Sequence, residues 1–156
     1  MDMPSPVAGH RKLEALVGRW EGTETLYPSQ WDPKGGEAQG VTTSRVALGG
    51  FALVSDYEQR RAGAVTFAGH AVYTFDAKSG DHTLHWFDSL GSPPEVFRGR
   101  FEGDVLTLGH GGPGMHMRMR WDLTTPGRLR SGMEMSEDGK AWKKLFDGEY
   151  RLVGEG

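Results

Sequence analysis

Hydrophobic and polar residues follow two different periods along this chain. In the first segment Leu13, Leu16 and Val17 recur at helical spacing, and Gly18 ends the run. This pattern predicts a short amphipathic helix near residues 9–17. From Arg19 onward the period becomes two, which is typical of strands that have one buried and one wet face.

The alternating segments predict about ten β-strands. They lie near Arg19–Tyr27, Val41–Leu48, Phe51–Gln59, Val65–Asp76, His82–Ser89, Glu95–Glu102, Val105–Leu108, Met117–Leu123, Leu129–Ser136 and Trp142–Leu152. Short glycine-containing turns join them, which indicates consecutive antiparallel hairpins. No helical pattern separates the strands, so parallel βαβ units are excluded.

A meander of this kind either closes into a barrel or splits into a two-sheet sandwich. Closure removes the exposed edges. Phe67, Gly69 and Tyr73 share one strand face, and inward glycines beside large aromatic rings suit tight curvature. We therefore predict an all-β fold, a single antiparallel up-and-down barrel whose strands run from residue 19 to residue 152, with a short N-terminal helix.

Composition narrows the class of protein. At 156 residues the chain is predicted to form a single domain, residues 1–156. The net charge of −3 argues against general binding to nucleic acid phosphates, and no apolar run approaches the roughly 20 residues of a membrane-spanning helix. The chain has no Cys, and its first residues lack the pattern of a secretory signal. We expect a cytoplasmic protein with no nucleic acid or membrane partner.

Several motifs resemble a known family. Gly18-Arg19-Trp20 opens the first strand after a short helix, as in the Gly-x-Trp signature of lipocalin-like (calycin) barrels. The ordered series LVGRWEG, ALGGFALVSDYEQ, HWFDSLGSPPEVFRG and MEMSEDGKAW, with a terminal GEYRL, resembles a mainly bacterial lipocalin-like family, domain of unknown function 1579. The resemblance covers nearly the whole chain. It implies a barrel with a central cavity, and it implies no activity.

A second, distant resemblance is to the nitrobindins, which are haem-binding barrels of similar size. Trp20-Glu21-Gly22 and Tyr27-Pro28 are similar to their first strand. The haem ligand of that family is a histidine near the C-terminus, whereas no histidine follows His116 here. We therefore expect no cofactor.

The strand His82–Ser89 poses a question of register. If Phe75 faces His82 across the preceding turn, Trp86 lies opposite Ala71 and Asp88 opposite Gly69, so that large residues meet small ones. His82, Trp86 and Asp88 then point inward, and the opposite face points outward. A slip of one residue reverses this arrangement. We favour the first register; the alternative interpretation is that Trp86 is core, Asp88 caps the following turn and the histidines lie on the surface.

Polar residues on inward faces are the main functional signal, since a filled core would avoid them. Glu24 shares a face with Trp20, and Lys144 lies between Trp142 and Phe146. An apolar cavity with a few convergent polar groups is typical of small-molecule sites. The alternative is that Glu24 and Lys144 reach water at the rim, or pair with each other, because the first and last strands of a closed barrel adjoin.

We therefore predict that the lumen binds a small, partly apolar molecule. The expected ligand-binding residues are Trp20, Glu24, Tyr57, Phe67, Tyr73, Trp86, Asp88, Phe97, Trp121 and Lys144. We expect no metal site, because His82 and His85 are three apart on a strand and point to opposite faces.

Two other functions stay open at this point. An enzyme would use Glu24 or Asp88 as a general base, with Tyr57 or His85 as its partner, but no catalytic motif singles out such a pair. An interaction protein, for example a homodimer, would use Trp31 in the irregular stretch Pro28–Gln39 as a contact or as a lid over the barrel mouth.

Overall fold

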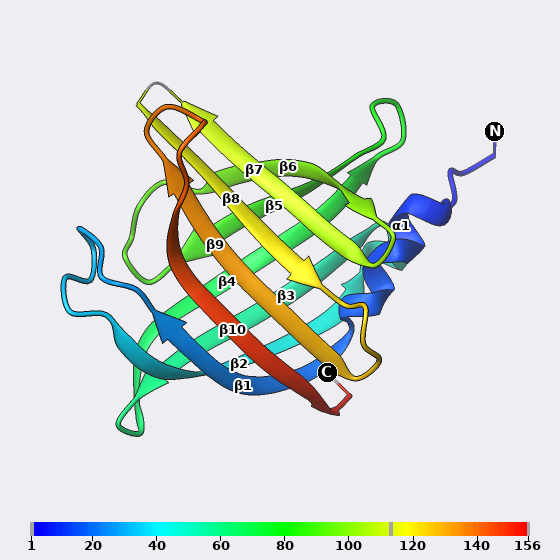
Figure 1. Cartoon of the computed structure of the whole chain (residues 1–156). Helices are drawn as coiled ribbons and strands as arrows, with labels where there is room; N and C mark the ends of the chain where they lie inside the picture. The colour runs from blue at the N-terminus through cyan, green and yellow to red at the C-terminus, as the bar shows by residue number, and fades with distance from the viewer. Residues whose placement is uncertain (1, 113, 156) are drawn as a thin grey trace.

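The strands close into a barrel, as predicted. The computed structural model describes residues 2–112 and 114–155, and Figure 1 shows the closed, strongly tilted sheet. All neighbouring strands are antiparallel, and β1 pairs with β10 to complete the circle. The strands are β1 (Gly18–Leu26), β2 (Gly36–Ala47), β3 (Ala52–Arg61), β4 (Ala64–Asp76), β5 (Asp81–Asp88), β6 (Glu95–Glu102), β7 (Val105–Gly112), β8 (Met115–Asp122), β9 (Arg128–Ser136) and β10 (Lys143–Gly154).

The N-terminal helix closes one end of the barrel (Figure 1). It consists of α1 (Ala8–Lys12), continued by the 3₁₀ turn η1 (Leu13–Leu16). Five α-helical residues are too few to be stable alone, so the segment depends on docking. Leu13 and Leu16 are buried, and the Trp20 indole Nε1 donates a hydrogen bond to the Leu16 carbonyl at 3.0 Å. These contacts hold the helical segment formed by α1 and η1, which we call the plug, against β1.

His82 ties the same end to the helix. Its Nε2 lies 2.8 Å from the Gly9 carbonyl oxygen and donates to it, and its ring packs between Phe75 and Phe101. Its Nδ1 is buried without a hydrogen-bond partner among the described residues. Burial lowers the pKa of His82 below its ordinary value, although the bond to Gly9 opposes this shift.

The opposite end, which we call the mouth, carries the β1–β2 loop. The predicted irregular stretch Pro28–Gln39 is shorter than expected, because β2 already begins at Gly36. The Ser29 hydroxyl accepts hydrogen bonds from the backbone N–H groups of Trp31 and Asp32, which shapes the turn. Asp32 in the same loop also forms a salt bridge with Arg61 at the end of β3.

The register of β4 and β5 is the one that we favoured. Phe75 lies opposite His82, Ala71 opposite Trp86, and Gly69 opposite Asp88. A Cβ added at Gly69 would lie 2.2 Å from the Trp86 ring, so this glycine provides the space that the indole occupies. The prediction of a large residue against a small one is confirmed.

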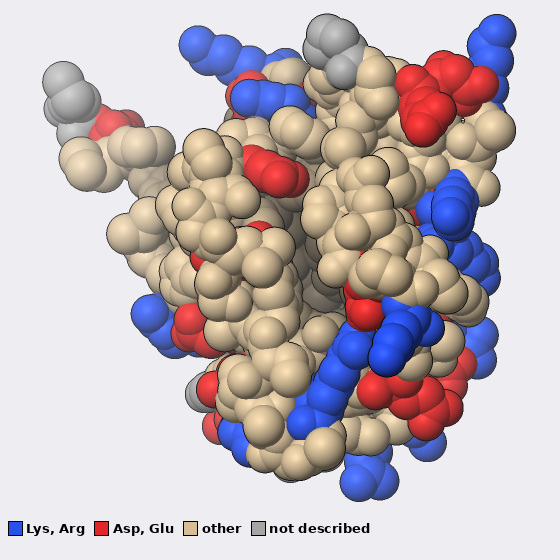
Figure 2. All heavy atoms as spheres, turned by 90° about the vertical axis from the view of Figure 1, so that its left-hand side faces the viewer, with Lys and Arg blue, Asp and Glu red and all other residues tan. Residues whose placement is uncertain are grey.

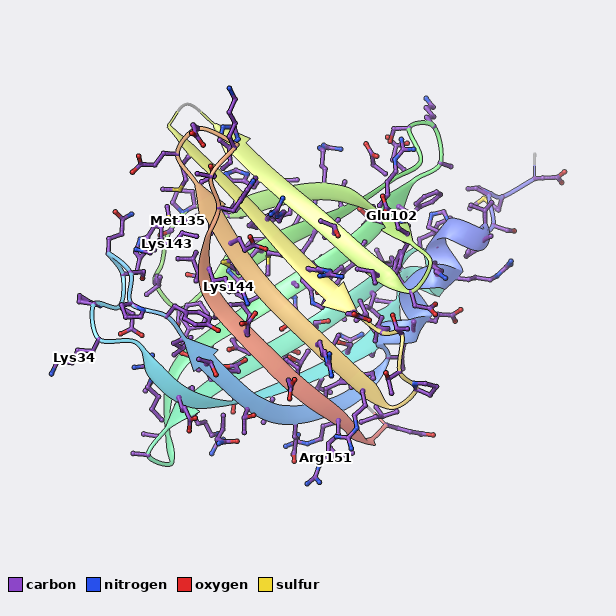
Figure 3. All side chains as sticks on the ribbon, in the orientation of Figure 1. Lys34, Glu102, Met135, Lys143, Lys144 and Arg151 are labelled. Carbon is purple, nitrogen blue, oxygen red and sulfur yellow. The ribbon has the colours of Figure 1, made fainter. Side chains whose placement is uncertain are left out.

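An irregularity in β10 overturns the predicted orientation of Lys144. Lys144 pairs with Glu134 and Phe146 pairs with Met133, so Leu145 is an extra residue between them. Such a bulge shifts the alternation by one residue. Leu145 and Phe146 consequently line the barrel interior, whereas Lys144 points outward near the mouth (Figure 3).

The same bulge corrects the predicted inward face of Trp142. This residue precedes β10, and the Arg118 guanidinium stacks on its ring at 3.9 Å from the centroid. Arg118 also pairs with Glu134 of β9. Trp142 therefore belongs to an outer cluster of charged residues and not to the lumen.

Candidate functional site

The barrel encloses a cavity of about 460 Å³ that opens at the mouth. Leu16 and Trp20 form its floor against the helical plug, and Trp31 and Leu90 line its entrance. Figure 2 views the molecule from the mouth side and shows a hollow between residues that are mostly uncharged. A cavity of this size is in the range of small-molecule sites.

Aromatic rings form much of the wall. Phe67 and Trp86 stack with ring centroids 6.3 Å apart and an interplanar angle of 25°. Tyr57 meets both rings, with its centroid 6.1 Å from that of Phe67. Deeper in the barrel, Tyr73 packs edge-on against Trp121. The wall thus offers flat apolar surfaces at two depths.

The methionines complete the apolar lining. Met115, Met117 and Met119 follow one another along β8 at a period of two, and Met133 faces them from β9. Unbranched thioether side chains adapt to irregular shapes more easily than branched ones. This side of the lumen can adjust to a guest, whereas the aromatic side is stiff.

Glu24 lies behind this wall and is only 1% exposed. Tyr57 donates its hydroxyl to both carboxylate oxygens, at 2.7 and 2.8 Å, and Gln59 Nε2 donates at 3.0 Å. Tyr150 donates a further hydrogen bond to Oε2. Three neutral donors thus surround one buried carboxyl group, so its oxygens are hydrogen-bonded within the protein.

The two tyrosines in this cluster remain protonated donors. Burial raises the pKa of Tyr57 well above its ordinary value, and the Glu24 charge raises it further. The same two causes, in the same order, raise the pKa of Tyr150. Neither hydroxyl ionises in the ordinary pH range, so neither serves as a base.

Two glycines provide the space for this cluster. A Cβ added at Gly40 would lie 2.4 Å from Glu24 Oε2, and one added at Gly148 would lie 2.3 Å from the Tyr150 hydroxyl. Gly148 lies opposite Glu24 across the β1–β10 pair, and Gly40 belongs to β2 on the other side. Carboxylate and phenol therefore fit side by side where larger residues would exclude them.

Asp88 stands at the mouth end of β5 and holds the local geometry. Its Oδ2 accepts a hydrogen bond from Trp86 Nε1 at 2.9 Å, and its Oδ1 accepts one from the Leu90 backbone N–H at 2.9 Å. The carboxylate thus caps the following turn, as the alternative interpretation expected, and also fixes the indole in the wall. His85, by contrast, points outward, so it cannot act on the cavity.

The structure brings most of the predicted site residues together. All except Glu24 and Lys144 line the cavity: Trp20, Tyr57, Phe67, Tyr73, Trp86, Asp88, Phe97 and Trp121. Glu24 is joined to the cavity wall through its hydrogen-bond partners Tyr57, Gln59 and Tyr150, which do line it. Whether these residues bind a ligand stays a prediction.

Lys144 does not belong to this group. Its Nζ lies 3.0 Å from Asp147 Oδ2 on the outer face of β10, and Asp147 also accepts a hydrogen bond from Tyr27. The hydrogen bond to Asp147 raises the pKa of Lys144. The expectation that Lys144 faces the lumen or pairs with Glu24 is therefore wrong.

Sequence reasoning missed several lining residues. Gln59 follows Tyr57 at a period of two and could have been included on that signal, because it ends a predicted strand. Glu95 could have been found in the same way from Phe97. The inward position of Leu145 had no such signal, because it depends on the bulge.

Two absences hold for residues 2–112 and 114–155. No three His, Asp or Glu side chains come close enough together there to hold a metal ion. No helix in that part of the chain has the length and apolarity needed to cross a membrane.

Solved structures of two other proteins share this fold. The crystal structure of Rv2717c from M. tuberculosis is similar with a TM-score of 0.68 at 15% sequence identity, over 94% of this chain and 98% of that one. The S-type phycobiliprotein lyase CPES from Guillardia theta is similar with a TM-score of 0.57 at 10% identity, over 97% of this chain and 99% of that one. Identities this low show the fold alone.

Sequence comparison settles the family. No curated protein matches the chain. The family described as protein of unknown function (DUF1579) matches residues 5–151, which is almost the entire sequence. The chain therefore belongs to the DUF1579 family.

Proposed function

We propose that this protein binds a small, partly apolar molecule in the barrel lumen. The observation that carries the proposal is the cavity of about 460 Å³, which is open at the mouth and has aromatic and methionine walls. A protein core is normally filled to close packing, so a hollow of this size needs a reason. Binding a guest is the simplest one.

The polar groups of the wall support this function. Ser44 and Ser55 bond to each other at 2.6 Å, and Tyr57 and Gln59 are engaged with Glu24. These groups are held in place before any guest arrives, which lowers the entropy cost of binding. They give a guest a few fixed polar contacts within a largely apolar surface.

Catalysis has less support than binding. Of the partners considered for a general base, His85 faces away from the lumen and Tyr57 is a protonated donor. Both Glu24 oxygens are already bonded within the protein. The proposal is accordingly a binding protein, and its support is the cavity and not the fold shared with other proteins.

A filled-cavity variant tests the proposal. Met133→Trp places a large ring into the lumen, whereas Arg130→Trp places the same ring on the outer face of the same strand. We expect Nile red, a neutral apolar dye, to bind the wild type and Arg130→Trp, and to bind Met133→Trp at least about tenfold more weakly. Fluorescence titration gives the dissociation constants, and circular dichroism verifies that both variants fold.

Native mass spectrometry of protein taken from its expression host provides a second readout. A copurified small molecule that is present in the wild type and absent from Met133→Trp supports lumen binding. Failure of the wild type to bind the dye, together with no copurified molecule, would contradict the proposal. Equal dye binding by both tryptophan variants would indicate that the dye binds outside the lumen.

A further inference from the structure

The charges of the cavity wall are all of one sign. Asp88 and Glu95 line the cavity, and no Lys, Arg or His does so among the described residues. Two nearby cations are engaged outside it: Arg61 pairs with Asp32 in the β1–β2 loop, and Lys144 pairs with Asp147. A guest that enters the lumen therefore meets carboxylates and, in the part of the chain that the structure describes, no basic side chain.

The two wall carboxylates stand close together at the mouth. Glu95 lies opposite Trp86 in the β5–β6 pair, and Asp88 is two residues beyond Trp86 on the same face. Diagonal neighbours of this kind are roughly 7–8 Å apart at the backbone, within reach of one small cationic group. Asp88 accepts hydrogen bonds from neutral N–H groups, so its charge is solvated by them but not cancelled.

Glu24 adds a third carboxyl group behind the wall. Its partners Tyr57, Gln59 and Tyr150 are all neutral, and no salt bridge involves it among the described residues. A carboxylate in a water-poor interior acts over a longer range than one in bulk solvent. Acidic residues therefore lie at depth as well as at the entrance.

Aromatic faces at the entrance, like the carboxylates, favour a positively charged ligand. Trp31 is 52% exposed, and with Trp86 it lines the cavity. The face of an indole attracts a cation and repels an anion. Carboxylates and indoles thus act in the same direction at the mouth.

From this arrangement we infer that the lumen selects amphiphiles that carry an amine or another cationic group and excludes those that carry a carboxylate or phosphate. The apolar body occupies the aromatic and methionine cavity, and the cationic head lies at the mouth between Asp88 and Glu95. Neutral molecules of the same shape bind less tightly than the cation and more tightly than the anion. This inference rests on the proposed function, because it names the class of ligand for the same cavity.

Three molecules that share one alkyl chain test this selectivity. Dodecylammonium, dodecanol and dodecanoate differ in the charge of the head group, and each is titrated below its micelle-forming concentration against bound Nile red. We expect dodecylammonium to displace the dye at a concentration at least about tenfold lower than dodecanoate does, with dodecanol between them. Added salt should reduce this difference between the ligands, because salt screens the exposed charges at the mouth.

Charge-neutralising variants locate the cause. Asp88→Asn with Glu95→Gln keeps the shape of both side chains and removes both mouth charges; it should abolish most of the preference for dodecylammonium. Glu14→Gln with Glu102→Gln changes the net charge equally, but at exposed positions of the opposite end of the barrel, where Glu14 belongs to η1 and Figure 3 shows Glu102. This control should leave the order of the three ligands unchanged.

The outcomes separate the two proposals. If the dye binds and dodecanoate displaces it as well as dodecylammonium does, the charge inference is wrong while lumen binding stands. An equal loss of selectivity in both double variants would assign the preference to the net charge of the protein. That result would also overturn the charge inference. If the wild type does not bind the dye and carries no copurified molecule, lumen binding itself fails.

Discussion

The two ends of the barrel are built differently from the same alternating strands. At the helical end Leu13, Leu16 and Trp20 are buried, and two hydrogen bonds, from Trp20 and from His82, fasten the plug to the barrel. At the mouth Trp31 and Leu90 are largely exposed, and the interior is hollow. Close packing stabilises one end, whereas the other leaves apolar surface uncovered.

This contrast separates stability from binding. Substitutions at the plug should reduce the free energy of unfolding, whereas substitutions at the mouth should alter ligand affinity with little cost in stability. Asp88 shows that the division has an intermediate zone, because it both caps a turn and faces the cavity.

The largest expected effect comes from the two tryptophans at opposite ends. Trp20→Ala removes a ring that is 3% exposed and should reduce the free energy of unfolding by about 3–5 kcal/mol, because it leaves a cavity and breaks the bond to Leu16. Trp31→Ala should change it by less than about 0.5 kcal/mol, because half of that ring is already in water. Urea titration of the wild type and of each variant measures these two changes in the free energy of unfolding. Similar losses in the two variants would contradict the contrast between the ends.

The second effect tests the Glu24 cluster. Tyr150→Phe removes a hydrogen bond to a buried carboxylate and should cost about 1.5–3 kcal/mol in the free energy of unfolding. Tyr73→Phe is the matched control: Tyr73 is also buried, and burial raises its pKa, but its hydroxyl has no side-chain hydrogen bond among the described residues. It should be almost neutral. An equal cost at both positions would mean that the bond to Glu24 contributes nothing particular.

The third effect concerns the glycine beneath Trp86. Gly69→Ala should force the indole toward the lumen, costing about 1–3 kcal/mol in stability and weakening Nile red binding. Gly112→Ala, also near the mouth, meets no atom within 4 Å and serves as the control. Unchanged dye affinity in Gly69→Ala would show that Trp86 does not shape the occupied part of the cavity.

The smallest effect is a pH dependence at the plug. The pKa of His82 is lower in the folded than in the unfolded state, so the unfolded state binds more protons once the pH falls below the ordinary histidine value of about 6.5. This contribution to stability is complete above that value and decreases below it, by at most about 1.4 kcal/mol per pH unit. His10 and Asp81 are the charged neighbours, acting in opposite directions.

His82→Phe should remove this slope. A phenyl ring fits between Phe75 and Phe101 and has no proton to take up. Urea titrations of the wild type and the variant at about pH 7.5 and about pH 5.5 give the difference, in which the other histidines cancel. Parallel slopes in the two proteins would assign the acid sensitivity to another group.

Local sequence patterns predicted much of this structure. The period of two located all ten strands, and the glycine-rich turns between them implied antiparallel neighbours. The register of β4 and β5 followed from matching Trp86 to Ala71 and Asp88 to Gly69, since a slip would have placed large residues against each other. Most of the cavity wall followed from these two facts.

Lys144 marks the limit of such reasoning. Its predicted orientation assumed uninterrupted alternation in the last strand, and one extra residue at Leu145 reversed it. A bulge of this kind forms where the closing strand must bend to meet its neighbours, which no single segment encodes. The same change brought Leu145 inward and left Trp142 beneath Arg118.

The sequence by itself determined the alternation of inward and outward side chains, the small helix and the residues able to line a lumen, because these depend on contacts between near neighbours. Only the tertiary structure decided that three donors from β3 and β10 converge on Glu24, that the cavity stays hollow, and that no basic side chain from residues 2–112 and 114–155 lines its wall. These features depend on where distant strands meet when the barrel closes. Closure is a property of the whole sheet, and the distances across a lumen are not written in any one strand.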